Sequence, residues 1–190
     1  GASGPADAPG WILPYGDSPF NGENIGEMVY MDILNRARKY VHIMTPYLII
    51  DNEMITALTF AAKRGVDVKI ITPGRPDKKT VFAVTRSYYR ELIAGGVQIY
   101  EYSPGFVHAK TFVSDGDTAV TGSINLDYRS LYLHFECAAL MYRTPAAADI
   151  EADFQKTLAK CRRMTLEDCR KDRLGRRLMG WLLRPLAPLM

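Results

Sequence analysis

The chain has 190 residues, a formal net charge of +3 at pH 7, 47% hydrophobic residues and 24% charged residues. These values are typical of a single globular domain with a substantial core, and they exclude a disordered chain, a collagen-like fibre and a disulfide-stapled miniprotein. No run of about 18 uncharged apolar residues occurs, so we expect no membrane-spanning helix.

The first 22 residues are rich in glycine and proline and show no hydrophobic periodicity. The opening GASGPADAPG lacks an initiating Met and is typical of a linker or a cloning remnant, so we expect a fragment of a longer protein. We assign residues 1–22 to a linker and extended lead-in, residues 23–164 to a domain, and residues 165–190 to a C-terminal tail.

Helical and strand patterns then alternate along the domain. Helices are predicted over residues 25–39, 51–64 and 77–94, and strands over residues 40–46, 66–71 and 97–100. After residue 106 three strands follow closely, over residues 108–113, 118–121 and 133–141, the first two as a hairpin. Helices are predicted at residues 149–163 and 166–183. This order predicts an α/β fold with a mixed, partly parallel sheet flanked by helices.

Three cysteines, Cys137, Cys161 and Cys169, are spaced unlike a metal site, and His42, His108 and His134 are scattered. We expect reduced thiols in a cytosolic setting, and neither a metal nor another cofactor.

Positive charge is concentrated at the C-terminal end. From Lys160 onward there are nine Lys or Arg and three acidic residues, whereas the preceding 159 residues carry 15 basic and 18 acidic residues. This distribution argues against a broad nucleic-acid-binding face and for a local anionic contact. The basic, Leu- and Trp-containing tail predicts an amphipathic helix, either at the interface of an anionic membrane or against a missing part of the protein.

The segment from His108 to Asn125 contains the candidate catalytic and binding residues. His108 and Lys110 are two positions apart on a predicted strand, so their side chains should share a face. An imidazole beside an ammonium suits a phosphoryl group, with histidine as nucleophile or proton donor. Ser123 and Asn125 add neutral hydrogen-bond donors, and Gly122 allows close backbone approach.

Together these residues resemble the HxK(x)4D(x)6GSxN signature of the phospholipase D superfamily, called the HKD motif. Its fixed positions are His108, Lys110, Asp115, Gly122, Ser123 and Asn125. The segments Thr45-Pro46-Tyr47, Arg64–Val68 and Asn125–Ser130 are similar to the C-terminal half of bacterial cardiolipin synthases. The resemblance implies one of the two lobes of a phospholipase D-type α/β sandwich.

The resemblance also implies roles for individual residues. His108, Lys110, Asp115 and Glu136 would be catalytic, with Glu136 orienting the histidine, and Asp115 has the alternative of a structural turn residue. Lys110, Ser123 and Asn125 would bind phosphate. Tyr47 and Arg129 are candidates for a headgroup pocket, each with a structural alternative.

The implied reaction transfers a phosphatidyl group between two phosphatidylglycerols through a phosphohistidine, giving cardiolipin and glycerol. Such enzymes carry two HKD motifs with the active site between them, and only one is present here. The expected partners are therefore phosphatidylglycerol, a membrane surface, and either an N-terminal HKD half or a second copy, without nucleic acid. By analogy with two-motif relatives, His108 would be the general acid, and an isolated monomer would be inactive.

The implied location of the whole enzyme is the cytoplasmic face of the cell membrane, with this fragment soluble or peripheral. The alternative function is a single-motif phosphodiesterase or nuclease that acts as a homodimer. That function requires a basic groove, and the body that bears the motif is mildly acidic.

Overall fold

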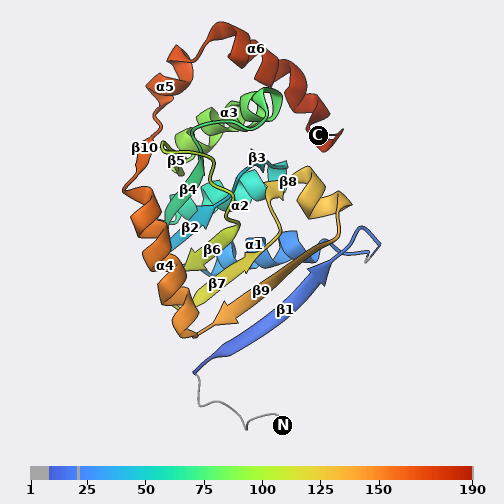
Figure 1. Ribbon diagram of the computed structural model, residues 1–190, viewed down its shortest axis with the longest axis vertical. Coiled ribbons are helices and arrows are strands. Elements are labelled where there is room, and N and C mark those ends of the chain that lie inside the picture. Colours follow the sequence, from blue (N-terminus) through green and yellow to red (C-terminus); the bar gives the residue numbers. More distant parts are fainter. Residues whose placement is uncertain (1–8, 21, 190) are drawn as a thin grey trace.

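The computed structural model describes residues 9–20 and 22–189, with side chains through residue 187. An eight-stranded sheet has the order β1-β9-β7-β6-β2-β4-β5-β10, and a second, two-stranded sheet pairs β3 with β8 (Figure 1). The strands are β1 (Trp11–Asp17), β2 (Tyr40–Met44), β3 (Leu48–Ile49), β4 (Asp67–Pro73), β5 (Gln98–Tyr102), β6 (Thr111–Ser114), β7 (Thr118–Gly122), β8 (Leu126–Asp127), β9 (Glu136–Tyr142) and β10 (Cys161–Arg163).

The helices are α1 (Ile25–Arg36), α2 (Asn52–Lys63), α3 (Lys79–Ala94), α4 (Pro145–Leu158), α5 (Leu166–Lys171) and α6 (Leu174–Leu183). A short π-helical segment η1 (Arg129–Leu133) and a 3-10 segment η2 (Arg184–Leu189) complete the list. Strands β2, β4 and β5 are parallel, and the remaining pairings of the large sheet are antiparallel. The predicted mixed, partly parallel sheet is confirmed.

Alternating side chains of the central strands build two hydrophobic layers. Val41 and Ile43 of β2 face the large core formed with α1, α2 and α3. Met44 faces the opposite side, where it packs with Phe154 of α4. Both faces of the central strands are therefore covered by helices, as parallel strands require.

Helix α2 shows how local sequence sets an element. The Asp51 side chain accepts a hydrogen bond from the Met54 backbone N–H at 2.8 Å, which caps the first turn. At the other end Gly65 has φ +93°, a conformation that glycine adopts without a Cβ penalty. The helix predicted over residues 51–64 is confirmed at both ends.

The two edge strands of the large sheet were not predicted. Strand β1 lies within the segment assigned to the extended lead-in and pairs antiparallel with β9, Tyr15 opposite Ala138. Strand β10 pairs with β5 and lies within a segment predicted as helix over residues 149–163. Residues 1–8 and residue 21, which belong to the predicted linker and lead-in, lie outside the described residues.

The C-terminal tail folds back onto this domain. Helix α6 packs against α3, at the opposite end of the molecule from β1 in Figure 1. A Cβ on Gly180 would lie 2.5 Å from the Ala83 carbonyl oxygen, so the two helices are in backbone contact. Ala187 of η2 is buried in the large core. Within residues 9–20 and 22–189, no helix has both the length and the hydropathy needed to span a bilayer.

Candidate active site

Strand register brings the motif residues to one edge of the sheet. Thr111 at the start of β6 lies opposite Met44 at the end of β2, and it also lies opposite Thr121 near the end of β7. The residues just before β6 and just after β7 therefore meet beyond the carboxyl end of β2. This is the edge where open α/β sheets generally bind ligands.

His108 and Lys110 lie side by side at this edge. The Lys110 Nζ is 3.1 Å from His108 Nε2 and 3.2 Å from Nδ1, and it donates to the His108 carbonyl oxygen at 2.9 Å. The pair precedes β6, because that strand begins at Thr111 rather than at His108 as predicted. His108 is exposed. Its imidazole is therefore accessible to a substrate.

The surroundings of Lys110 shift the pKa of its ammonium group. Partial burial lowers the pKa of the ammonium, while the carboxylates of Glu136 and Asp127 act in the opposite direction, and the net shift is downward. Asp127 is itself buried, which raises its pKa. A bound phosphodiester would add negative charge beside Lys110 and favour its protonated form.

A hydrogen-bond network connects the remaining motif residues. Ser123 Oγ donates to one oxygen of Glu136, and Ser130 Oγ donates to the other at 2.8 Å. Asn125 Nδ2 donates to Ser130 Oγ at 3.0 Å, and among the described residues the buried Asn125 Oδ1 has no partner. The network fixes the Ser123 and Asn125 side chains around one carboxylate.

Glu136, predicted to orient the histidine, has other hydrogen-bond partners in this lobe. Its hydrogen bonds go to Ser123 and Ser130, and none among the described residues joins it to His108. It acts here by positioning the two hydroxyl groups. Ser130, at 2% exposure, was not predicted as a site residue, because a serine five residues past Asn125, the last motif residue, gives no signal by itself. The part of the chain that the structure covers has no group of three His, Cys, Asp or Glu side chains arranged to hold a metal ion.

Residues 30–158 match the family model described as "Cardiolipin synthase, PLD-like domain". The chain belongs to this family. An uncharacterized protein of Streptococcus mutans is 56% identical over 183 residues, which cover 96% of this chain and 40% of that protein. Cardiolipin synthase 2 of Bacillus anthracis is 40% identical over 162 residues, covering 85% of this chain and 32% of that protein. The chain thus spans only about a third to two fifths of the length of these relatives.

Solved structures confirm the phospholipase D-type fold. The phosphatidylserine synthase of Haemophilus influenzae superimposes with a TM-score of 0.72 at 17% identity, over 94% of this chain and 45% of that one. Nuc of Salmonella typhimurium, a phospholipase D family member, gives 0.69 at 20% identity, over 82% of this chain and 99% of that one. At these identities the likeness concerns the fold alone.

Asp115 of the HKD motif lies away from the site edge, which favours the structural alternative over the catalytic one. It occupies the turn between β6 and β7, at the opposite end of β6 from Lys110. Its carboxylate accepts hydrogen bonds from the backbone N–H groups of Arg38, Lys39 and Tyr40, at 2.8, 2.8 and 3.0 Å. Partial burial acts to raise its pKa, but these hydrogen bonds outweigh it and lower the pKa. Asp115 thus ties the hairpin to the start of β2.

We expect Asp115→Asn to lower stability and to leave the activity of an enzyme that contains this lobe unchanged at temperatures well below melting. Hydrogen bonds to a charged acceptor are lost, at a cost of about 1–2 kcal/mol, while asparagine tolerates the φ of +54° at this position. Thermal unfolding and an activity assay measure the two effects. Asp117→Asn is the control, since the Asp117 side chain bonds only the neighbouring Thr118 hydroxyl among the described residues. If Asp115→Asn lost activity without losing stability, the result would support a catalytic role for Asp115.

Tyr47 and Arg129, predicted for a headgroup pocket, have different surroundings. The Tyr47 hydroxyl donates to Asp77 at 2.5 Å, and burial together with Asp77 raises the pKa of Tyr47 to about 12. Its ring is 6.3 Å from Phe106, which is 5.8 Å from the His108 ring, so an aromatic row leads to the imidazole. Arg129 is exposed and makes no ion pair within the described residues. Phe106 was not predicted, because a lone aromatic in a loop has no pattern.

Two acidic residues, Glu27 and Asp51, hold η1, the segment that carries Ser130. The Tyr132 hydroxyl is 2.6 Å from a Glu27 oxygen and also contacts an Asp51 oxygen. One hydroxyl donates only one proton, so a second proton must reside on one of the carboxyl groups. Burial, and to a smaller degree the neighbouring Asp51, raises the pKa of Glu27 to about 7.

We expect Glu27→Gln to flatten the pH dependence of stability. The folded protein binds a proton at Glu27 up to about pH 7, whereas the unfolded chain releases it near 4.5. Stability therefore falls as pH rises through this window, by at most about 3 kcal/mol. Urea unfolding across the pH range measures the slope in wild type and variant. The control is Asp153→Asn, an exposed carboxyl of α4 that makes no ion pair among the described residues, and it should keep the wild-type slope. An equal slope in wild type and Glu27→Gln would contradict this assignment.

Proposed function

We propose that this chain is the C-terminal half of a cardiolipin synthase. It would transfer a phosphatidyl group from one phosphatidylglycerol to a hydroxyl group of another, releasing glycerol. The observation that carries this proposal is the exposed imidazole of His108 beside the Lys110 ammonium, next to the ordered Ser123–Glu136–Asn125 network. Similarity to the cardiolipin synthases supports the choice of substrate class.

In this proposal the chain's polar residues bind the phosphate diester. The Lys110 ammonium neutralises one non-bridging oxygen, and the second N–H of the Asn125 amide, whose first bonds Ser130, hydrogen-bonds the other. The Ser123 hydroxyl, which donates to Glu136 in the free lobe, would turn to the phosphate when substrate binds. Glu136 and Ser130 fix the positions of both side chains before substrate arrives, so little rearrangement is needed when charge builds on the phosphoryl oxygens in the transition state.

Transfer then needs two imidazoles. A nitrogen of the first imidazole attacks phosphorus, and the bond between phosphorus and the glycerol oxygen breaks. That oxygen takes a proton from the second imidazole. A hydroxyl of the second phosphatidylglycerol gives its proton to the second imidazole and attacks phosphorus, which frees the first. His108 supplies one of the two, and by family analogy it is the acid and base. The other comes from an N-terminal lobe or from a second copy of this chain.

The experiment follows from the shared site. We expect the monomeric chain to be inactive with phosphatidylglycerol, and co-expression with its N-terminal half to restore cardiolipin formation. Mass spectrometry of the quenched two-lobe enzyme then locates the phosphoryl adduct, and phosphatidyl on His108 would assign it as the nucleophile. Synthase activity in a strictly monomeric chain would overturn the proposal.

The second candidate function is a homodimeric phosphodiesterase. It is favoured by one observation, that Nuc is matched over 99% of its own length and so has a single lobe of this size. The excess of acidic over basic residues before Lys160 opposes a nucleic-acid substrate. Cleavage of DNA by a dimer in the presence of EDTA would favour this candidate, and we expect none.

The proposed partners are an anionic phospholipid, the membrane surface that presents it, and the second HKD half. The proposed location is the cytoplasmic face of the cell membrane. A lipid substrate must be reached from the bilayer surface, which raises the question of which surface of this chain makes that contact.

A further inference from the structure

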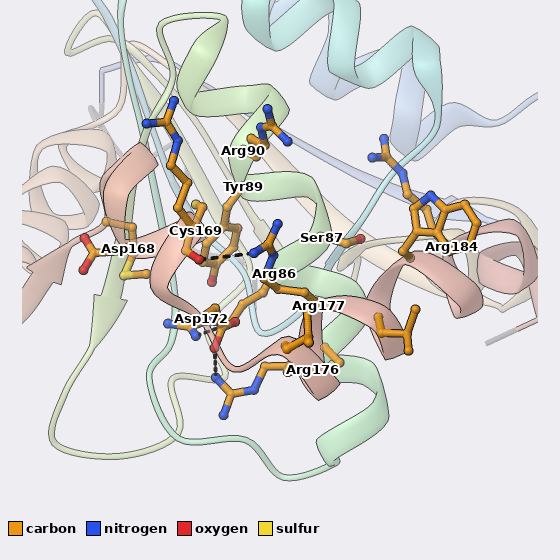
Figure 2. Close-up of a pocket in the computed structure, with 16 residues that line it drawn as sticks. Arg86, Ser87, Tyr89, Arg90, Asp168, Cys169, Asp172, Arg176, Arg177 and Arg184 are labelled. Atoms are coloured by element: carbon orange, nitrogen blue, oxygen red, sulfur yellow. Dashed lines mark hydrogen bonds and ion pairs between the residues drawn. The ribbon is translucent and has the colours of Figure 1, made fainter.

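A cavity of about 340 Å³ lies between α3 and the C-terminal helices α5 and α6, outside the active site (Figure 2). Its volume is within the range of small-ligand sites. Arginines are the main charged side chains that line it, accompanied by only two acidic residues, Asp168 and Asp172. The arginines are Arg86, Arg90, Arg170, Arg176, Arg177 and Arg184.

Three of these arginines form the frame of the cavity. Arg86 and Arg176 converge on the Asp172 carboxylate, at 3.0 and 2.8 Å, as the dashed lines in Figure 2 show. Arg184 bonds Glu91 at 2.6 Å. Arg86 also pairs with Glu101 of β5 at 2.7 Å, so three carboxylates, those of Asp172, Glu91 and Glu101, neutralise these three arginines within the fold.

The other three arginines are left without an acidic partner. Among the described residues, Arg90, Arg170 and Arg177 make no ion pair, and all three are exposed. Arg177 donates one hydrogen bond to the Arg170 carbonyl oxygen, at 3.2 Å, which brings these two residues together. Guanidinium groups bind phosphate oxygens in pairs of parallel hydrogen bonds, so an uncompensated cluster of them suits a phosphate group.

An apolar ridge borders the same cavity. Leu174, Leu178, Trp181 and Leu182 follow the i, i+4, i+7, i+8 spacing of one helical face, and they are 77%, 54%, 70% and 56% exposed. The contact of Gly180 with α3 fixes the opposite face of α6 against the domain. The ridge therefore points outward as a rigid surface. Leu and Trp on one face with arginines beside them are typical of helices that lie in a membrane interface.

We propose that this cavity binds the phosphate headgroup of an anionic phospholipid while the α6 ridge enters the bilayer interface. The proposal deepens the proposed function, because it supplies the membrane contact that a lipid transferase requires. A soluble phosphate compound would explain the arginines and would leave the ridge without a partner. The combination of three free guanidinium groups and four exposed apolar side chains selects a lipid surface.

Sedimentation of the chain with vesicles tests the proposal. The vesicles are phosphatidylcholine alone, or phosphatidylcholine and phosphatidylglycerol in roughly equal parts. The chain should bind only the anionic vesicles, and the triple variant Arg90→Gln, Arg170→Gln, Arg177→Gln should bind on the order of a hundredfold more weakly. The charge-matched control is Arg38→Gln, Lys63→Gln, Lys156→Gln, three exposed positions outside the cavity, and it should bind within a few-fold of wild type.

A second pair of variants tests the ridge. Trp181→Ser should weaken binding to anionic vesicles about tenfold or more, whereas Phe60→Ser, an exposed aromatic of α2, should not. Equal loss in the two triple variants, full binding by the cavity variant, or no binding by wild type would each overturn the proposal. So would a dimer of the chain that Trp181→Ser dissociates, since a second copy would then cover the ridge. His108→Asn should bind vesicles as wild type does, so failure of docking and failure of the catalytic proposal remain distinguishable.

Discussion

Replacement of His108 by asparagine is expected to abolish phosphatidyl transfer, with a fall of about a thousandfold or more in an enzyme that contains both lobes. Asparagine keeps hydrogen-bonding capacity, but it can neither attack phosphorus nor exchange a proton near neutral pH. The imidazole is exposed and lies beside the Lys110 ammonium, so its loss removes no buried contact. The melting temperature should therefore be unchanged. Rates of cardiolipin formation at saturating substrate measure the effect.

His134→Asn is the matched control for this prediction. His134 is a second exposed imidazole, located just before β9, and it makes no hydrogen bond among the described residues. We interpret it as outside the catalytic machinery, so transfer should continue at close to the wild-type rate. If the two variants lost activity equally, His108 would no longer be distinguished as the reacting group.

Gly122→Ala is expected to have the largest effect on stability. A Cβ at this position would lie 2.4 Å from the Cys137 carbonyl oxygen and 2.5 Å from Ala138 Cα, both in the adjacent strand β9. Backbone atoms of a central sheet cannot move aside as a flexible side chain can. We expect a loss of about 3 kcal/mol or more, which corresponds to a fall in melting temperature of about 6–12 °C for a chain of this size. Calorimetry or thermal circular dichroism measures it.

Gly175→Ala is the control for the glycine substitution. No atom lies within 4 Å of a Cβ built on Gly175, and the residue is in the first turn of α6, where alanine favours the helix. Stability should be unchanged or slightly higher. A small effect of Gly122→Ala would show that β7 and β9 can separate locally. The close backbone approach that the motif glycine allows is thus the contact of β7 with β9.

The central part of the fold could be predicted because its signals are local. Asp51 and Gly65 mark the ends of α2, and short β-rich segments alternate with helices up to residue 102. The edge strands could not be predicted in the same way. Trp11–Leu13 of β1 is exposed, Pro14 is atypical of strands, and β10 has only three residues, so neither strand shows an alternating pattern. Strands β1 and β10 are therefore defined only by their pairing with β9 and β5 in the folded sheet.

The motif predicted which residues gather at the site edge, with one exception, and could not predict their contacts. His108, Lys110, Ser123 and Glu136 lie at the edge, because β6, β7 and β9 are adjacent and antiparallel. The hydrogen bond of Glu136 to Ser130 depends on the path of η1, which periodicity does not describe. For the C-terminal tail, too, the amphipathic character could be predicted from the sequence, whereas its packing against α3 could not.

The position of Asp115 has a consequence for how the HKD motif varies in length. Residues 111–114 between Lys110 and Asp115 are the whole of β6, so the interval measures one strand. One inserted residue would reverse the faces of all side chains beyond it, and removal of two would shorten the reach by about 6–7 Å. Either change would break the contact of Asp115 with the start of β2 or displace the His108 imidazole from the site edge. Length changes should therefore be tolerated in the loop before His108 and selected against inside this interval.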